Sequence, residues 1–164
     1  MKFDPNKKII LFDFDGVIHS YSSGWKGARN IPDPPVRGAI EFLIELCMNE
    51  EYKVCIYSSR SCQFGGKRAM KKWVIDHFIQ KSILSWEQTP DPYKTWIGQT
   101  AFADPWEYEV EYAAKRLIKS ISWPTKKPPA YLTVDDRAIC FDGSFSALRN
   151  RIKDFKTWYG KTQI

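Results

Sequence analysis

Three runs of apolar residues, each closing on a polar side chain, divide the sequence. They cover residues 8–13, 53–58 and 131–135 and end at Asp13, Ser58 and Asp135. Unbroken apolar runs of this length are typical of strands that are buried on both faces of a parallel sheet. We therefore predict three central strands whose carboxyl ends carry these three polar residues.

Apolar residues also recur with the 3.6-residue period of helices. Such stripes cover residues 36–47, 70–78, 106–121 and 145–159, and the last is expected to be buried from Phe145 to Tyr159. A short additional strand is expected at 82–86. Strands that alternate with helices predict an α/β protein with a mostly parallel sheet and helices on both faces. We expect one Rossmann-like, three-layer α/β/α domain over residues 1–164, with ligands bound beyond the carboxyl ends of the strands.

Composition and charge narrow the functional classes. The 164 residues suit one domain, and an apolar content of 43% predicts a folded protein. The formal net charge of +6 favours polyanionic partners such as nucleic acid or phosphorylated ligands, although a solvated basic surface explains it equally well. No apolar run reaches the roughly 18 residues of a membrane helix, and no signal-peptide pattern begins the chain, so we expect a cytoplasmic protein.

The cysteines and histidines suggest no chemistry of their own. The four cysteines form no C-x-x-C pair and are expected to be reduced thiols, and neither histidine stands at ligand spacing to a cysteine for a zinc site. We assign no role to the histidines and expect His77 to border the core. These residues are Cys47, Cys55, Cys62, Cys140, His19 and His77.

Carboxylates gather where the predicted strands end. Asp13 and Asp15 stand two residues apart as the chain leaves the first strand, with Gly16 permitting a sharp turn, and Asp135-Asp136 ends another strand. Both carboxylates of the first pair are expected to face one site. Four converging carboxylates stay ionised together only beside a cation, and Mg²⁺ prefers such hard oxygen ligands. Either pair alone is also compatible with an ordinary loop start or helix cap.

The segment Phe12-Asp13-Phe14-Asp15-Gly16-Val17 resembles the first motif of the haloacid dehalogenase (HAD) superfamily of phosphatases and phosphotransferases. Ser58, Lys127 and Asp135-Asp136 follow in the order of that family's second, third and fourth motifs. The resemblance spans residues 8–137. It implies a HAD-like fold and a Mg²⁺-dependent phosphatase.

The resemblance also implies a role for each motif residue. Asp13 would be the nucleophile that forms an aspartyl-phosphate, and Asp15 the general acid and base. Ser58 would donate a hydrogen bond to the phosphoryl group and Lys127 would neutralise its charge; Lys126 competes for this role, but Lys127 fits the family's spacing better. The expected metal shell comprises Asp13, the carbonyl of Phe14, Asp15, Asp135 and Asp136.

Short insertions between the motifs leave room for a minimal cap at most, which suits an open site and macromolecular substrates. Ser58-Ser59-Arg60 and Asp135-Asp136-Arg137 are similar to motifs in the 3′-phosphatase half of phage polynucleotide kinases. This similarity implies that Ser59, Arg60 and Arg137 help to bind phosphate in the present chain. The whole sequence also resembles small stand-alone HAD proteins of bacteriophages. The expected substrate is a nucleotide or a nucleic-acid end. The alternative is a nucleic-acid-binding protein on the same scaffold with little or no catalysis.

Overall fold

A parallel three-stranded sheet forms the centre of the protein. The computed structural model describes residues 4, 6–87, 105–140, 145 and 148–157. The strands are β1 (Lys8–Phe12), β2 (Tyr52–Ile56) and β3 (Leu132–Val134), in the order β2-β1-β3. β1 pairs in parallel with both neighbours, so that Phe12 lies opposite Ile56 on one side and Val134 on the other. All three strands therefore end at one edge of the sheet, as their sequences predict.

Helices follow the strands at the positions that the periodicity predicts, apart from one segment. The helices are α1 (Ala39–Met48), the short 3-10 turn η1 (Ser59–Cys62), α2 (Gly66–Glu87), α4 (Pro105–Ser120) and α5 (Leu148–Lys153). The predicted strand at 82–86 is wrong, because these residues form the end of α2. Neither glycine nor proline occurs between Gly66 and Glu87, so nothing interrupts the helix.

The core confirms that β1 and β2 are buried on both faces. Ile10, Phe12, Val54 and Ile56 pack with residues of α1, α2 and α4, while Leu11 and Cys55, which point the other way, are also buried. β3 differs, since two of its three residues are exposed. The prediction that both faces of a strand are buried is therefore confirmed for β1 and β2 but not for β3.

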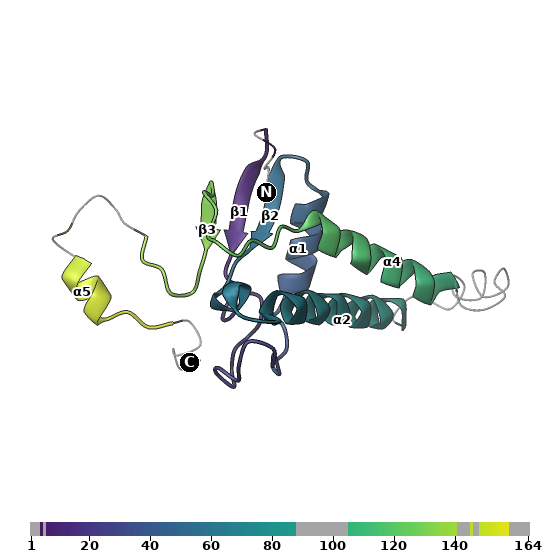
Figure 1. The fold of residues 1–164 in the computed structure, drawn as a ribbon, viewed down its shortest axis with the longest axis horizontal. Coiled ribbons are helices and arrows are strands. Elements are labelled where there is room, and N and C mark those ends of the chain that lie inside the picture. Colours follow the sequence, from purple (N-terminus) through teal and green to yellow (C-terminus); the bar gives the residue numbers. More distant parts are fainter. Residues whose placement is uncertain (1–3, 5, 88–104, 141–144, 146–147, 158–164) are drawn as a thin grey trace.

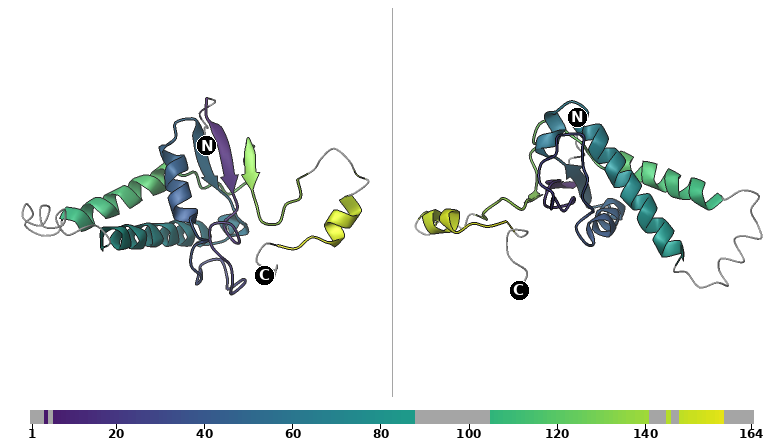
Figure 2. Two further views of the ribbon diagram at one scale, coloured as in Figure 1. Left: turned by 180° about the vertical axis from the view of Figure 1, so that it is seen from behind. Right: turned by 90° about the horizontal axis from the view of Figure 1, so that it is seen from below.

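Figures 1 and 2 show α1, α2 and α4 on the β2 side of the sheet, whereas the chain after β3 extends away on the opposite side. The buried stripe predicted at 145–159 is wrong in its described part. α5 has only six residues, and Phe145, Ile152 and Phe155 are exposed. Tyr159 lies outside the described residues.

The described chain is thus a mixed α/β protein. Its four cysteines are all free thiols, as expected. His77 is half-buried beside Trp73, at the border of the core. None of the helices within the described residues has the length and apolar character required to cross a membrane.

Candidate functional site

Three carboxylates meet where β1 and β3 end. Asp13 follows β1, Asp135 and Asp136 follow β3, and the backbone N–H of Asp13 donates to the carbonyl of Val134 at 2.9 Å. One carboxylate oxygen from each aspartate lies within 4.8 Å of the other two. The parallel pairing of β1 with β3 therefore brings together residues that are more than 120 positions apart.

The three carboxylates repel one another, and a cation between them would reduce this repulsion. Burial, together with the charges of Asp135, Asp15 and Asp136, raises the pKa of Asp13 from its ordinary value of 3.8 to about 7, against the opposing hydrogen bond from the Phe14 N–H. The side chain of Asp136 is only 1% exposed. Three oxygen ligands in a partly dehydrated site fit a hard divalent cation, with positions left for water and a phosphate oxygen. The donor set is thus compatible with Mg²⁺.

A cavity of about 200 Å³ opens beside these carboxylates. Asp13 and Asp135 line it together with three residues of the other predicted motifs: Ser58, Ser59 and Lys127. Lys126, the competing candidate for the third motif, is absent from the lining. Residues from four separate segments of the chain, with carboxylate, hydroxyl and ammonium side chains, therefore line one small space.

Ser58 reaches this cavity as the N-cap of η1. Its hydroxyl accepts a hydrogen bond from the N–H of Arg60 at 3.3 Å, while its own N–H donates to the hydroxyl of Ser61 at 3.0 Å. These reciprocal bonds fix the side chain, which is buried. A hydroxyl that accepts one hydrogen bond keeps its proton for a second partner. Ser58 can therefore cap η1 and also donate into the cavity.

Asp15 does not join the carboxylate group. Its carboxylate is buried and accepts hydrogen bonds from Arg60 Nε at 3.1 and 2.8 Å and from His19 Nδ1 at 2.9 Å. Burial alone would raise the pKa of Asp15, but the hydrogen bonds and charges of His19 and Arg60 outweigh it and lower the pKa. The structure therefore gives no support to Asp15 as a metal ligand.

Arg60 contacts protein groups instead of open solvent. Its side chain is 0% exposed, and besides Asp15 it binds the loop that follows the first motif. Nη1 donates to the carbonyls of Gly27, Ala28 and Asn30 at 2.7, 3.1 and 3.2 Å, and the guanidinium lies 4.5 Å from the centre of the Trp25 ring. In this arrangement Arg60 orients Asp15 and the loop, and its contact with a phosphate stays a prediction.

The sequence analysis missed His19. This side chain is fully buried, stacks on Phe14 and connects Asp15 to Asp33. The N–H of Asp33 donates to His19 Nε2 at 3.2 Å, so Nε2 is the acceptor and Nδ1 carries the hydrogen that is donated to Asp15. The only signal in the sequence is a histidine four residues after an aspartate, which is not specific outside a helix.

The carbonyl of Phe14, which is predicted for the metal shell, is already hydrogen-bonded. It accepts backbone hydrogen bonds from Ile18 at 3.0 Å and His19 at 2.9 Å, which occupy both of its lone pairs. Gly16 follows with a φ of 86°, and a Cβ atom at this position would lie 2.7 Å from Oδ2 of Asp136. Glycine is thus required twice, by the backbone conformation and by the approach of a site carboxylate.

Arg137 stays at the rim of the site. Its backbone N–H donates to Oδ1 of Asp135 at 2.8 Å, and its Nε lies 3.6 Å from Oδ2 of Asp136. The guanidinium also lies 5.7 Å from the centre of the Tyr21 ring. Its side chain is 57% exposed. Unlike Arg60, Arg137 is therefore accessible to a ligand at the carboxylate group.

Comparisons with protein-family models, with curated proteins and with solved structures found no match to this chain.

Proposed function

We propose that this protein is a Mg²⁺-dependent phosphomonoesterase of HAD-like fold that forms an aspartyl-phosphate, with a nucleotide or a nucleic-acid end as its substrate. The observation that carries the proposal is the shared cavity, because Asp13 and Asp135 line it together with Ser58 and Lys127 and are grouped with Asp136. A phosphate needs cationic and hydrogen-bonding groups, and a metal needs the carboxylates. Both requirements are met in one space.

Asp13 is the nucleophile in this proposal. Its carboxylate oxygen attacks phosphorus, the bond to the leaving oxygen breaks, and water later attacks phosphorus to release phosphate and restore Asp13. Mg²⁺, held by Asp13, Asp135 and Asp136, would offset the negative charges of the carboxylates and of the phosphoryl group. Ser58 donates to a phosphoryl oxygen and Lys127 neutralises part of the charge.

Asp15 supplies and removes the proton. The first step needs a protonated Asp15, whereas Arg60 and His19 hold it ionised. Asp15 does not line the cavity, but its charge already acts on the pKa of Asp13. A phosphate dianion bound beside Asp13 therefore also acts on Asp15, raises its pKa and favours proton uptake. In the second step the ionised form serves as the base that activates water. Arg60 and His19 are positioning residues for both steps.

The decisive experiment compares phosphate release by the unchanged chain and by Asp13→Asn, with Asp154→Asn as a matched control at an exposed position beyond α5. The panel contains an aryl phosphate, nucleoside 3′- and 5′-monophosphates and end-phosphorylated oligonucleotides, each with Mg²⁺ and with EDTA. We expect release only with Mg²⁺, its loss in Asp13→Asn and its retention in the control.

Turnover by Asp13→Asn within about tenfold of the unchanged chain would exclude this nucleophile, since removal of a catalytic nucleophile costs several orders of magnitude. If every substrate is inert while calorimetry detects Mg²⁺ binding, the phosphatase proposal fails. The nucleic-acid-binding alternative would then be favoured.

A further inference from the structure

A second, larger hollow is lined by the loop at 29–31 and by the beginning of α2. It has a volume of about 670 Å³. We call it the α2 groove. Its lining includes Phe64, Arg29, Arg68, Lys72, Trp73 and Asp76. None of these residues has a role in the proposed chemistry.

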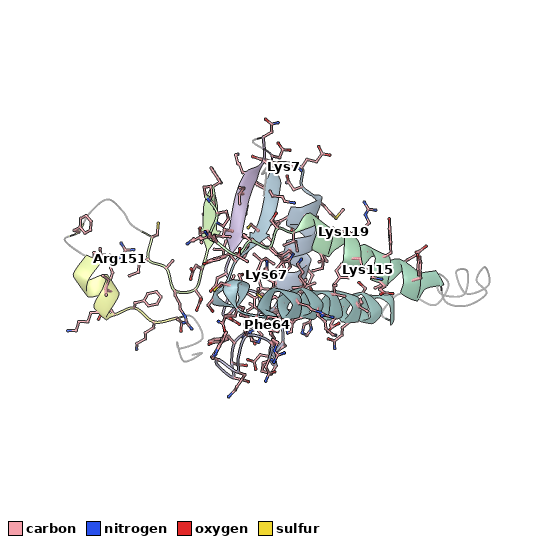
Figure 3. The ribbon with its side chains drawn as sticks, viewed as in Figure 1. Lys7, Phe64, Lys67, Lys115, Lys119 and Arg151 are labelled. Carbon is pink, nitrogen blue, oxygen red and sulfur yellow. The ribbon has the colours of Figure 1, made fainter. Side chains whose placement is uncertain are left out.

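Phe64 is the unusual member of this lining. Its side chain is 92% exposed, although it adjoins a groove whose floor includes the buried Trp73. Figure 3 shows Phe64 where α2 begins, near Lys67. An aromatic ring that is exposed at the mouth of a basic groove offers a flat face on which a base can stack.

The charge of the groove is positive. Three cations and one carboxylate line it, and Lys72 pairs with Asp76 at 2.6 Å. Within the part of the chain that the structure describes, Arg29 and Arg68 form no ion pair. Two guanidinium groups therefore remain for an anionic ligand, and guanidinium groups suit phosphate oxygens.

The groove is directly connected to the candidate active site. Asn30, which lines the groove, accepts a hydrogen bond at its carbonyl from Arg60 Nη1, and the same guanidinium binds Asp15 through Nε. The cavity residue Ser58 directly precedes η1 and the groove residue Phe64 follows it by two positions, and the four residues of η1 rise by only about 8 Å. A chain bound in the groove can therefore place its end at the cavity.

We infer that the α2 groove binds a single-stranded nucleic-acid segment, with a base stacked on Phe64 and backbone phosphates held by Arg29 and Arg68, while the terminal phosphate enters the carboxylate cavity. A single strand is favoured over a duplex because only an unpaired base exposes its face to the Phe64 ring. This inference rests on the proposed function for the fate of the terminal phosphate, and it narrows the substrate class to a polynucleotide.

The test measures binding without turnover. A fluorescent single-stranded oligonucleotide of about 12 nucleotides, long enough for typical single-strand sites, is titrated by anisotropy in EDTA. Phe64→Ala and Arg68→Ala are compared with Tyr108→Ala and Lys119→Ala, which remove an exposed aromatic ring and an exposed cation from α4. Phe64 and Tyr108 are largely exposed, so neither substitution should alter folding, which thermal unfolding checks.

We expect Phe64→Ala to weaken binding by about fivefold or more, the lower limit for the loss of one stacked base. Arg68→Ala should reduce the slope of log K against log salt by about 0.7, the contribution of one single-strand phosphate contact. Both controls should bind within about twofold of the unchanged chain, because surface changes away from a site have small effects.

Equal binding by the groove variants and the controls would overturn the inference. So would a duplex of the same sequence that binds as tightly as the single strand, or equal competition by a nucleoside monophosphate or by polyglutamate. Failure of the proposed function can be told apart from failure of this inference. If only the proposed function fails, the groove variants still weaken binding in EDTA, but no phosphate is released in the activity assay.

Discussion

Replacing Arg60 by methionine tests the buried network beneath the site. The methionine side chain is long and apolar, so Arg60→Met fills most of the space and removes only the guanidinium. The change deprives the Asp15 carboxylate of two hydrogen bonds and three loop carbonyls of their donor. The effect is therefore mainly electrostatic, on a carboxylate that stays buried.

The magnitude follows from the burial of both partners. The Arg60 side chain is fully buried and that of Asp15 is 10% exposed. Removal of one member of a buried ion pair costs about 3–5 kcal/mol when the other charge is left without a partner. Asp15 keeps its hydrogen bond from His19. We therefore expect a loss at the lower end of that range, about 3 kcal/mol, against the 5–15 kcal/mol that stabilises a typical domain.

Urea unfolding at neutral pH, followed by circular dichroism, measures this loss. Arg37→Met, which removes an exposed arginine, is the matched control and should change the free energy of unfolding by less than about 0.5 kcal/mol. In a double-mutant cycle, Arg60→Met combined with Asp15→Asn should cost less than the sum of the single changes, with a coupling energy of about 2 kcal/mol. Additive effects, or a loss below about 1 kcal/mol for Arg60→Met, would show that the network does not form.

The same pair has a defined pH dependence. Arg60 and His19 lower the pKa of Asp15 below its ordinary 3.8, so the stability that they confer is fully present above that ordinary value. It is lost as the pH falls through the lowered pKa. The difference in unfolding free energy between the unchanged chain and Arg60→Met should therefore narrow in acid. A difference that stays constant at the lowest pH at which both chains remain folded would contradict this assignment.

Two further predictions concern the carboxylate group. Gly16→Ala places a Cβ atom 2.7 Å from Oδ2 of Asp136, whereas Gly24→Ala, the control, causes a similar backbone strain with nothing within 4 Å of its Cβ atom. Calorimetry should therefore show weaker Mg²⁺ binding for Gly16→Ala alone. Equal Mg²⁺ affinities of the two variants would refute the close approach of Asp136 to Gly16. Because the pKa of Asp13 is raised to about 7, the folded protein without metal holds a proton that the unfolded chain has already released, and its stability should fall as the pH rises from about 4 to 7. Mg²⁺ needs the ionised carboxylate, so the rise in Tm on adding Mg²⁺ should be largest above pH 7, and a rise that is equal on both sides of this pH would contradict the raised pKa.

The strands could be predicted from the sequence because the residue types within one short segment indicate a buried strand. Residues 8–12 and 52–56 form short, mostly apolar runs that are typical of a strand covered on both faces, and the parallel pairing then brings their ends together. The region at 145–159 shows the limit of the same approach. Periodicity identifies the face that a helix would bury, but it does not say whether another element is present to cover it. Phe145 and Ile152 lie on the face that the periodicity predicts to be buried, and both are exposed.

The partners of buried polar residues are the part that the sequence does not contain. Arg60 is found by its motif, yet its contacts with Asp15 and with the loop at 27–30 depend on how that loop folds back over η1. His19 has no motif that would set it apart from any other histidine. A hydrogen bond between residues that are 45 positions apart, such as that of Arg60 and Asp15, is a property of the tertiary structure alone.

The two aspartates of the first motif show how the end of a strand changes a prediction. In a continuous strand, residues two apart face the same side, which is the reason for expecting Asp13 and Asp15 in one site. β1 ends at Phe12, however, and the turn from Phe14 to His19 directs Asp15 toward Arg60 while Asp13 stays beside Asp135. The pKa of Asp13 is consequently raised and that of Asp15 lowered.

These shifts are opposite to what the proposed first step requires, since a nucleophile must be ionised and an acid protonated. A cation at the carboxylate group lowers the pKa of Asp13, and a phosphate dianion in the cavity raises that of Asp15. In the proposed mechanism, each ligand therefore corrects one of the two protonation states. The proposal predicts that phosphate release needs the metal and the substrate together.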